Sequence, residues 1–394
     1  MTRRTSRSPH TSRSTRTSHS PRTSHKPRAS RGAAATSALM PVFVNVADPA
    51  WMQEVRMVVA VTGRILVPVT DEMEPPAEAG SACRTIGYLV ADHATPWDKH
   101  PNLTVIRVDT CTPSLDDGGA LTLAERIGAD DRPLIAVTGA VGGAGTSLFA
   151  ASIAHYLHAQ GTPVLVVDAD RDSAGVDVVY GLENQPGWRL GDLPEDATWE
   201  DVAANTPQLC DVDGAGIPVL AASRDVTASS RDSSGSMPGW GGRVASVLRG
   251  TQRPATVMDC GRSLPDELGE LGREIDLHVM MVPLTVPSIV AARDRIARIA
   301  ADGRTEPVVV VRDIPGSTTT VNLAATMLAI RPAARIPEDR HCLQAVETGQ
   351  VSHWLTSTHR NGHPAAATVI KAFDNARAEL ITDVLSSYTV ARAG

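Results

Sequence analysis

A glycine-rich turn between a strand pattern and a helix pattern constrains this chain more than any other segment. Residues 134–138 form a short apolar run, and an apolar helix pattern begins at Leu148. Between them, Gly142, Gly143 and Gly145 can adopt backbone angles closed to other residues, so successive N–H groups can point into one concavity. The N-terminus of the helix adds partial positive charge at the same place. The segment therefore predicts a loop that holds phosphate oxygens.

This loop departs from the phosphate-binding motif G-x-x-x-x-G-K-[ST] at two positions. Ala140 stands where the first glycine is expected and Thr146 where the lysine is expected, whereas Ser147 keeps the hydroxyl that coordinates Mg²⁺. From these residues alone, a tight turn that only packs well stays open as the alternative. The predicted nucleotide-binding residues are Gly142, Gly143, Ala144, Gly145, Thr146 and Ser147.

Three carboxylates stand at the ends of predicted strands. Asp168 and Asp170 follow one apolar run, and Asp259 follows another. Because the carboxyl ends of parallel strands meet at one edge of a sheet, we expect these acids beside the phosphate loop. The arrangement predicts that Ser147, Asp168 and Asp259 bind Mg²⁺, some of them through water. Each acid alone is equally typical of a solvated strand end or a helix cap.

Short apolar segments alternate with helical stretches from residue 133 onward. Parallel strands buried on both faces have this appearance. The pattern predicts an α/β fold, a doubly wound and mostly parallel sheet with helices on both faces. The polar, Gly/Ser-rich residues 223–242 predict a loop. The predicted strands are 134–138, 164–168, 217–221, 256–259, 277–282 and 308–312, and the clearest helices are 147–160 and 288–301.

The N-terminal part divides into three segments. Residues 1–40 are poor in large apolar side chains, and residues 1–32 hold nine basic and no acidic residues. They predict a disordered basic tail, whereas the remainder has 28 basic and 44 acidic residues, a net charge of −16. Nucleic acid could therefore be contacted only through the tail. Residues 41–111 predict a small α/β domain, with strands at 41–46, 65–69, 86–91 and 103–108 and a helix at 51–61; residues 112–132 predict a linker before the domain at 133–390.

Cysteines and apolar segments bear on location. The five cysteines form no C-x-x-C pair, which is typical of a reduced cytoplasm and argues against disulfides or a zinc site. No apolar run approaches the roughly 18 residues needed to span a bilayer. The stripe from Val369 to Leu385 has a mixed polar face rather than a basic one, so we expect core packing and no membrane contact through this helix. The expected location is the cytoplasm.

Four stretches together resemble the MinD/ParA superfamily of P-loop proteins: GAVGGAGTS, VLVVDADRDSAGVDVVYGLENQPGWRLGDL, VMDCG and IPEDRHCLQAVETGQ. Within it they look most like the CpaE-like, septum-site-determining proteins of actinobacteria, over roughly residues 133–385. The resemblance implies that Asp170 positions the attacking water and that Asp259 is the Walker B acid. It implies ATP or ADP with Mg²⁺ as the cofactor, a homodimer, and protein partners in division or pilus-secretion machinery.

Both lysines of the family's loop, K-G-G-x-G-K-[ST], are replaced here, by Val141 and Thr146. Loss of cations beside phosphate predicts weak nucleotide binding and hydrolysis that is slow or lost. Arg171 and Arg312 occupy places from which an arginine could substitute. Three functions stay open: a nucleotide-binding regulator, a slow ATPase of the same family, and a scaffold that binds no nucleotide.

The same resemblance implies that residues 41–111 are a receiver-like domain. Asp48 and Asp92 stand roughly at two of its acidic positions, but a second acid of the first pair and the lysine are missing. Because this site chemistry is incomplete, we expect a pseudo-receiver used for docking.

Overall fold

The structure, a computed structural model, describes the chain over separate ranges. The described residues are 40–75, 87–100, 103–108, 119–120, 123–124, 127, 132–170, 175–212, 215–222, 240–248, 254–302, 304, 306–359 and 362–390. The predicted basic tail apart from Met40, most of the predicted linker, most of the predicted loop at 223–242 and Arg171 lie outside them. The predicted domain boundaries stay predictions.

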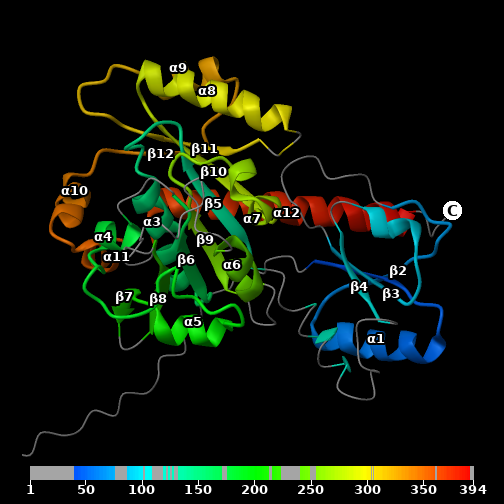
Figure 1. Ribbon diagram of the computed structural model, residues 1–394. Coiled ribbons are helices and arrows are strands. Elements are labelled where there is room, and N and C mark those ends of the chain that lie inside the picture. The colour runs from blue at the N-terminus through cyan, green and yellow to red at the C-terminus, as the bar shows by residue number, and fades with distance from the viewer. Residues whose placement is uncertain are drawn as a thin grey trace, which may run out of the picture. The chain divides into compact units, whose positions relative to one another are not determined.

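The first described segments form a four-stranded parallel sheet of order β2-β1-β3-β4 (Figure 1). Its strands are β1 (Val42–Asn45), β2 (Leu66–Pro68), β3 (Gly87–Ala91) and β4 (Leu103–Arg107), with the 3-10 helix η1 (Pro96–Lys99) before β4. Helix α1 (Pro49–Val61) starts two residues before the predicted Trp51, because the Asp48 side chain accepts hydrogen bonds from the first-turn N–H groups. The predicted α/β pattern of this segment is confirmed.

An eight-stranded sheet follows in the described part of the chain, of order β12-β11-β10-β5-β9-β6-β8-β7. All its strand pairs are parallel except β7 with β8. The strands are β5 (Leu134–Gly139), β6 (Val164–Asp168), β7 (Gln208–Val212), β8 (Ala215–Leu220), β9 (Ala255–Asp259), β10 (Leu277–Pro283), β11 (Val308–Arg312) and β12 (Ala334–Ile336). Strands β6 to β9 lie on one side of β5, and strands β10 to β12 lie on the other. The turn after β5 therefore lies where the strand order reverses.

Helices cover both faces of this sheet, as predicted. Within β5, Leu134 belongs to the hydrophobic cluster that includes α6, whereas Ile135 belongs to the cluster that includes α3 and α12. This alternation follows from the two-residue repeat of a strand, and it confirms the doubly wound α/β architecture. The helices are α3 (Thr146–Ala159), α4 (Val176–Tyr180), α5 (Trp199–Asn205), α6 (Trp240–Leu248), η3 (Pro265–Leu268), α7 (Glu270–Arg273), α8 (Val286–Ala301), α9 (Val321–Leu328), α10 (Arg340–Glu347), α11 (Val351–Thr358) and α12 (Pro364–Val390).

Three elements differ from the sequence prediction. The predicted loop at 223–242 was wrong at its end, since α6 begins at Trp240 and buries Val244, Val247 and Leu248 against the sheet. The two edge strands, β7 and the short β12, were not predicted. The β7 segment mixes apolar and polar residues, and its pairing with β8 is irregular between Leu209 and Val212. Tertiary packing therefore decides these elements.

Helix α12 packs in the core of the molecule. Val369, Ile370 and Phe373 belong to the hydrophobic cluster that contains α3 and the central strands. The prediction of core packing for this stripe is confirmed at these residues. No helix in the described residues is both long enough and apolar enough to span a membrane.

Two glycines bring the end of α4 against the turn after α10. Gly181 has φ 74° and Gly349 has φ 64°, a region that L-residues with side chains rarely adopt. A Cβ on Gly181 would stand 2.2 Å from the carbonyl oxygen of Gly349. This backbone contact joins the GLE stretch to the AVETG stretch, two of the segments that carried the family resemblance.

The contact predicts a difference between two alanine substitutions. Gly181→Ala should lower the free energy of unfolding by about 2–4 kcal/mol, because it adds a backbone clash to the strained φ. Gly161→Ala is the matched control, since Gly161 has φ 83° but nothing within 4 Å of its Cβ position; it should cost about 1 kcal/mol. Equal losses in urea unfolding would contradict the role of the Gly181–Gly349 contact.

A buried histidine stands beside β5. His278 Nε2 lies 2.8 Å from Thr138 Oγ1, and the ring is almost fully buried. Burial, together with the charges of Arg295 and Arg304, lowers the pKa of His278 to about 3. Because the imidazole is neutral in the folded state and titrates near 6.5 when unfolded, its contribution to stability is present above pH 6.5.

That contribution should be lost as the pH falls from 6.5 toward 3. At pH 5 the linkage amounts to roughly 2 kcal/mol relative to pH 7. His278→Gln removes the titrating group, so the pH dependence of its unfolding free energy should be shallower between pH 7 and 5. Denaturant unfolding at both pH values measures this. Equal slopes for the two proteins would show that His278 does not control acid stability.

Candidate functional site

The turn between β5 and α3 presents free backbone donors. It is anchored at its start, where Gly139 N–H donates to Gly261 O (2.7 Å) and Ala140 N–H to Met281 O (2.9 Å). Gly143 and Gly145 then have φ values of 70° and 97°. Within the described residues, no backbone or side-chain group accepts a hydrogen bond from the N–H groups of residues 142–147, and α3 has no side-chain cap. These donors at a helix N-terminus suit an anion.

Ser147 lies beside Asp259, the predicted Walker B acid. The Ser147 side chain is close enough to the Asp259 carboxyl group to lower its pKa. Asp259 and Asp168 are paired in register at the ends of the neighbouring strands β9 and β6. The carboxyl oxygen of Asp170 lies against Gly261, because a Cβ there would stand 1.9 Å from Asp170 Oδ2. The structure thus brings all four predicted side chains to one edge of the sheet, beside the loop.

The two strand-end acids have different surroundings. Asp168 is held by backbone groups, since Oδ1 accepts from Asp170 N–H (3.2 Å) and Oδ2 from Val176 N–H (3.0 Å). Asp259 Oδ1 accepts from Gly261 N–H (3.2 Å), whereas its Oδ2 is buried and has no hydrogen-bond partner in the described part of the chain. A buried carboxylate oxygen without a partner is costly unless a cation or donor completes it.

Electrostatics at Asp259 point the same way. Burial, with the nearby charges of Asp168 and Asp170, raises the pKa of this carboxyl to about 7, although Ser147 and the Gly261 N–H act to lower it. A divalent cation would remove both effects, because it favours the ionised form.

The donor set fits Mg²⁺ rather than a metal held by protein alone. Among the described residues, no group of three His, Cys, Asp or Glu side chains is arranged to hold a metal ion by itself. Mg²⁺ usually takes one or two protein oxygens and completes its shell with water and phosphate oxygens. A hydroxyl at Ser147 and one free oxygen at Asp259 match that requirement.

Tyr180 is a site residue that sequence reasoning missed. It is the last residue of α4, is fully buried, and its hydroxyl donates to the backbone oxygen of Ser147 (2.8 Å). Burial, with the nearby Asp259 and Asp168, raises the pKa of Tyr180 well above its usual range, so it stays a neutral donor. The signal available in the sequence was its place in the VVYGLE stretch, next to Gly181.

The positions of the two missing lysines are occupied by uncharged side chains. The Thr146 methyl group lies 3.2 Å from the Cβ position of Gly139, so it packs against the start of the loop. Of the two arginines considered as substitutes, Arg312 reaches the loop, where its Nε donates to Ala144 O (3.1 Å) and its Nη2 to Gly143 O (3.0 Å). Arg171 lies outside the described residues.

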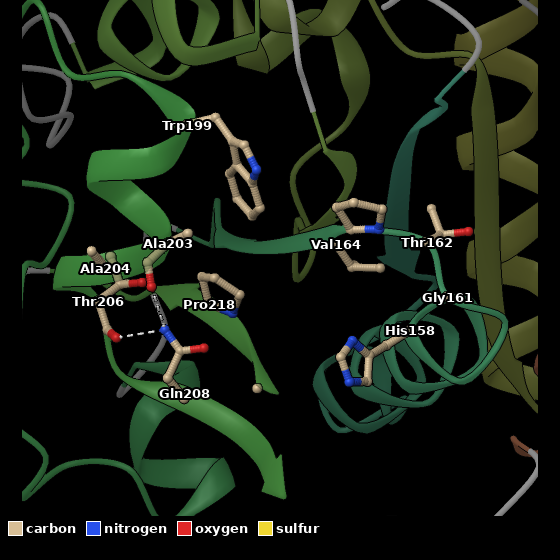
Figure 2. Close-up of a pocket in the computed structure, with 12 residues that line it drawn as sticks. His158, Gly161, Thr162, Val164, Trp199, Ala203, Ala204, Thr206, Gln208 and Pro218 are labelled. Atoms are coloured by element: carbon tan, nitrogen blue, oxygen red, sulfur yellow. Dashed lines mark hydrogen bonds between the residues drawn. The ribbon is translucent and has the colours of Figure 1, made fainter. Parts of the chain in front are cut away.

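A cavity of about 540 Å³ lies near the start of β6, at the end of that strand opposite to Asp168. Its lining includes Pro163 and Val164 at the start of β6, His158 near the end of α3, and Trp199 of α5 (Figure 2). Asp168 lies at the other end of β6. None of the predicted site residues lines this cavity, so it is separate from the phosphate loop.

A second polar cluster stands at the carboxyl edge of the four-stranded sheet. Asp92 Oδ2 accepts from Asp48 N–H (2.9 Å), and Asp92 Oδ1 lies 2.5 Å from His93 Nδ1. His93 Nε2 is 3.4 Å from Asp71 Oδ2, and Asn45 donates to Asp71 Oδ1 (2.8 Å). The hydrogen bond to Asp92 raises the pKa of His93. Both Asp92 oxygens are therefore engaged by protein groups, and the pseudo-receiver assignment stays a prediction.

Comparison with known proteins gives one family match. Residues 133–213 match the family model described as cellulose biosynthesis protein BcsQ. The matched segment contains the glycine loop, Ser147, Asp168 and Asp170. No curated protein matches the chain in sequence.

One solved structure shares the fold, and others are similar to this chain. A ParA family ATPase from Chlorobium tepidum has 13% identity and a TM-score of 0.50, and the match covers 61% of this chain and 98% of that one. The septum site-determining protein MinD from Pyrococcus horikoshii, complexed with Mg-ADP, has 16% identity and a TM-score of 0.45. The match covers 60% of this chain and 93% of that one. The MinC:MinD cell division protein complex of Aquifex aeolicus contains a chain with 22% identity and a TM-score of 0.45. That match covers 63% of this chain and 95% of the other.

These matches agree with the predicted MinD/ParA superfamily, whereas nothing in them separates a CpaE-like member from others. Residues 133–213 are similar to the BcsQ family model, and the chain has the fold of a ParA family ATPase.

Proposed function

We propose that this protein binds ATP or ADP with Mg²⁺ at the turn between β5 and α3, and acts as a nucleotide-dependent regulator that hydrolyses slowly or not at all. The observation that carries the proposal is that N–H groups without acceptors at residues 142–147 stand beside Ser147 and the buried Asp259. Glycine-rich turns that only pack tightly have no need of an unpartnered carboxylate oxygen at their end.

Each predicted residue has a distinct task in this proposal. The loop N–H groups hold phosphate oxygens, and the N-terminus of α3 favours their negative charge. Ser147 and Asp259 Oδ2 bind Mg²⁺ directly. Asp168 binds it through water, because its own oxygens already accept backbone N–H groups. When bound, Mg²⁺ supplies positive charge that neutralises the phosphate oxygens. Asp170 has the water-positioning task that the superfamily implies.

Slow hydrolysis follows from the two substituted positions. Charge develops on the phosphate oxygens in the transition state, and a cation placed beside them lowers the barrier. Val141 and Thr146 offer none, and the Thr146 side chain packs back on Gly139. Binding depends less on these cations than hydrolysis does, since backbone donors and Mg²⁺ also hold the ground state.

The finer cellular role rests on resemblance. We propose a homodimer whose nucleotide state controls the recruitment of protein partners, in the cytoplasm, to position division or secretion machinery. The MinC:MinD complex of Aquifex aeolicus is a partner complex of one structural relative. The alternatives are a slow but true ATPase of the same group and a scaffold that binds no nucleotide.

A binding titration tests the proposal first. With a fluorescent ADP analogue and Mg²⁺, the wild-type protein should bind, and removal of Mg²⁺ by EDTA should weaken binding. Thr146→Lys should tighten it by about 10- to 100-fold, because a charge-assisted contact to phosphate adds roughly 1.5–3 kcal/mol. Thr326→Lys, at an exposed position of α9, adds the same charge away from the loop and is the control.

Two outcomes would contradict this reading. Absence of binding by the wild-type protein at millimolar nucleotide would leave the scaffold alternative. Equal effects of Thr146→Lys and Thr326→Lys would show that the loop is not the phosphate site.

A phosphate-release assay separates the regulator from the slow ATPase. The wild-type rate should be roughly 10²-fold below that of the double variant Val141→Lys/Thr146→Lys, by analogy with loss of one transition-state donor. In the double variant, Asp170→Ala should abolish release, whereas Asp196→Ala, at an exposed acid outside the site, should not. Fast release by the wild-type protein that depends on Asp170 would overturn the regulator assignment.

A further inference from the structure

Arg312 grips the phosphate loop from its outer side. It is the last residue of β11, and its guanidinium donates to two consecutive loop carbonyls, Gly143 O at 3.0 Å and Ala144 O at 3.1 Å. Its Cδ and Nε atoms stand 3.6 Å from the Cβ position of Gly145. The contact joins residues that are more than 160 positions apart in the sequence.

The geometry of the peptide group decides what this contact does to the loop. In a trans peptide the C=O and the following N–H point in opposite directions across one plane, and the described chain contains no cis peptide bond. A donor on the carbonyls of Gly143 and Ala144 therefore directs the N–H groups of Ala144 and Gly145 to the other, inner side of the loop. Those are two of the N–H groups that have no acceptor within the described residues.

The guanidinium also acts through charge. Hydrogen bonds from an ionised donor are stronger than neutral ones, and a chain of hydrogen bonds polarises each member. An arginine on the oxygen end of a peptide makes its N–H end a better donor to an anion. The guanidinium thus polarises the N–H groups on the inner side of the loop through two peptide groups, although the side chain itself stays outside the loop.

Arg312 is not neutralised by the acid next to it. The carboxylate of Asp313 is taken by a bidentate ion pair with Arg335, at 2.8 Å for each contact. In the described part of the chain, no carboxylate lies within ion-pair distance of Arg312. Its charge is therefore directed at the loop.

We propose that Arg312 is a positioning residue that replaces, from outside the loop, part of the positive charge that Val141 and Thr146 no longer provide. It aligns and polarises the N–H groups of Ala144 and Gly145 for a nucleoside phosphate bound with Mg²⁺. This inference rests on the proposed function, since it assumes that the loop binds phosphate.

The test compares variants that separate charge from hydrogen bonding. Arg312→Lys keeps the charge, and Arg312→Gln keeps a neutral donor. Arg331→Gln removes the charge of an exposed arginine before β12 and is the control. Binding of the fluorescent ADP analogue with Mg²⁺ is measured for each full-length protein, with thermal unfolding to confirm folding. We expect about a tenfold loss of affinity in Arg312→Gln, a smaller loss in Arg312→Lys and none in Arg331→Gln.

Adding Thr146→Lys gives a readout that a purely structural role would not move. If the charge matters, the new ammonium should reduce the loss caused by Arg312→Gln to about twofold or less. An unchanged loss in that background, or a loss in Arg312→Lys as large as in Arg312→Gln, would overturn the charge-based role. So would wild-type affinity in Arg312→Gln. No binding by the wild-type protein would instead refute the proposed function and is thereby distinguishable.

Discussion

The contact between Ser147 and Asp259 connects the fold of this protein to its chemistry. It joins the first turn of α3 to the end of β9, and it exists only because β5 and β9 are neighbours in a parallel sheet. The contact places a hydroxyl beside a carboxyl group whose pKa is raised by burial to about 7, even with Ser147 acting to lower it. Its remaining oxygen has no partner among the described residues. A cation is the simplest completion of such a pair, and a cation at this point implies an anion on the adjacent N–H groups.

The loop has the backbone form of a phosphate-binding turn but no ammonium group. Gly143 and Gly145 retain the backbone angles that turn N–H groups toward one side, and the helix N-terminus is retained with them. Thr146 fills space against Gly139 instead of extending toward a ligand. Arg312 binds the carbonyl side of the same turn. Backbone dipoles and one external arginine thus supply positive electrostatic potential at the loop. In the proposed function, this favours ground-state binding over rapid phosphoryl transfer.

The sequence predicted the sheet because its central strands are nearly pure apolar runs, and it predicted the cluster of Ser147, Asp168, Asp170 and Asp259 because strand ends converge in a parallel sheet. It could not predict contacts that depend on side-chain reach across the fold. Tyr180 looked like one more apolar helix residue, although its hydroxyl binds the backbone of Ser147. The hydrogen bonds of Arg312 to the loop depend on the register of β11 against β10 and of β10 against β5, which the sequence does not give. Edge strand β7 was not predicted because its apolar pattern is weak and its pairing with β8 is irregular.

The central claim, that the N–H groups of residues 142–147 receive the phosphate of a nucleotide without an ammonium group in the loop, is open to direct observation. Backbone amide resonances of the ¹⁵N-labelled protein, recorded while Mg-ADP is added, report which donors gain an acceptor. The account predicts that the largest changes fall on the amides from Gly142 to Ser147 and on Gly261, beside Asp259. Unchanged loop amides, with the changes gathered instead around Trp199 and Gln208 at the far edge of the sheet, would contradict it.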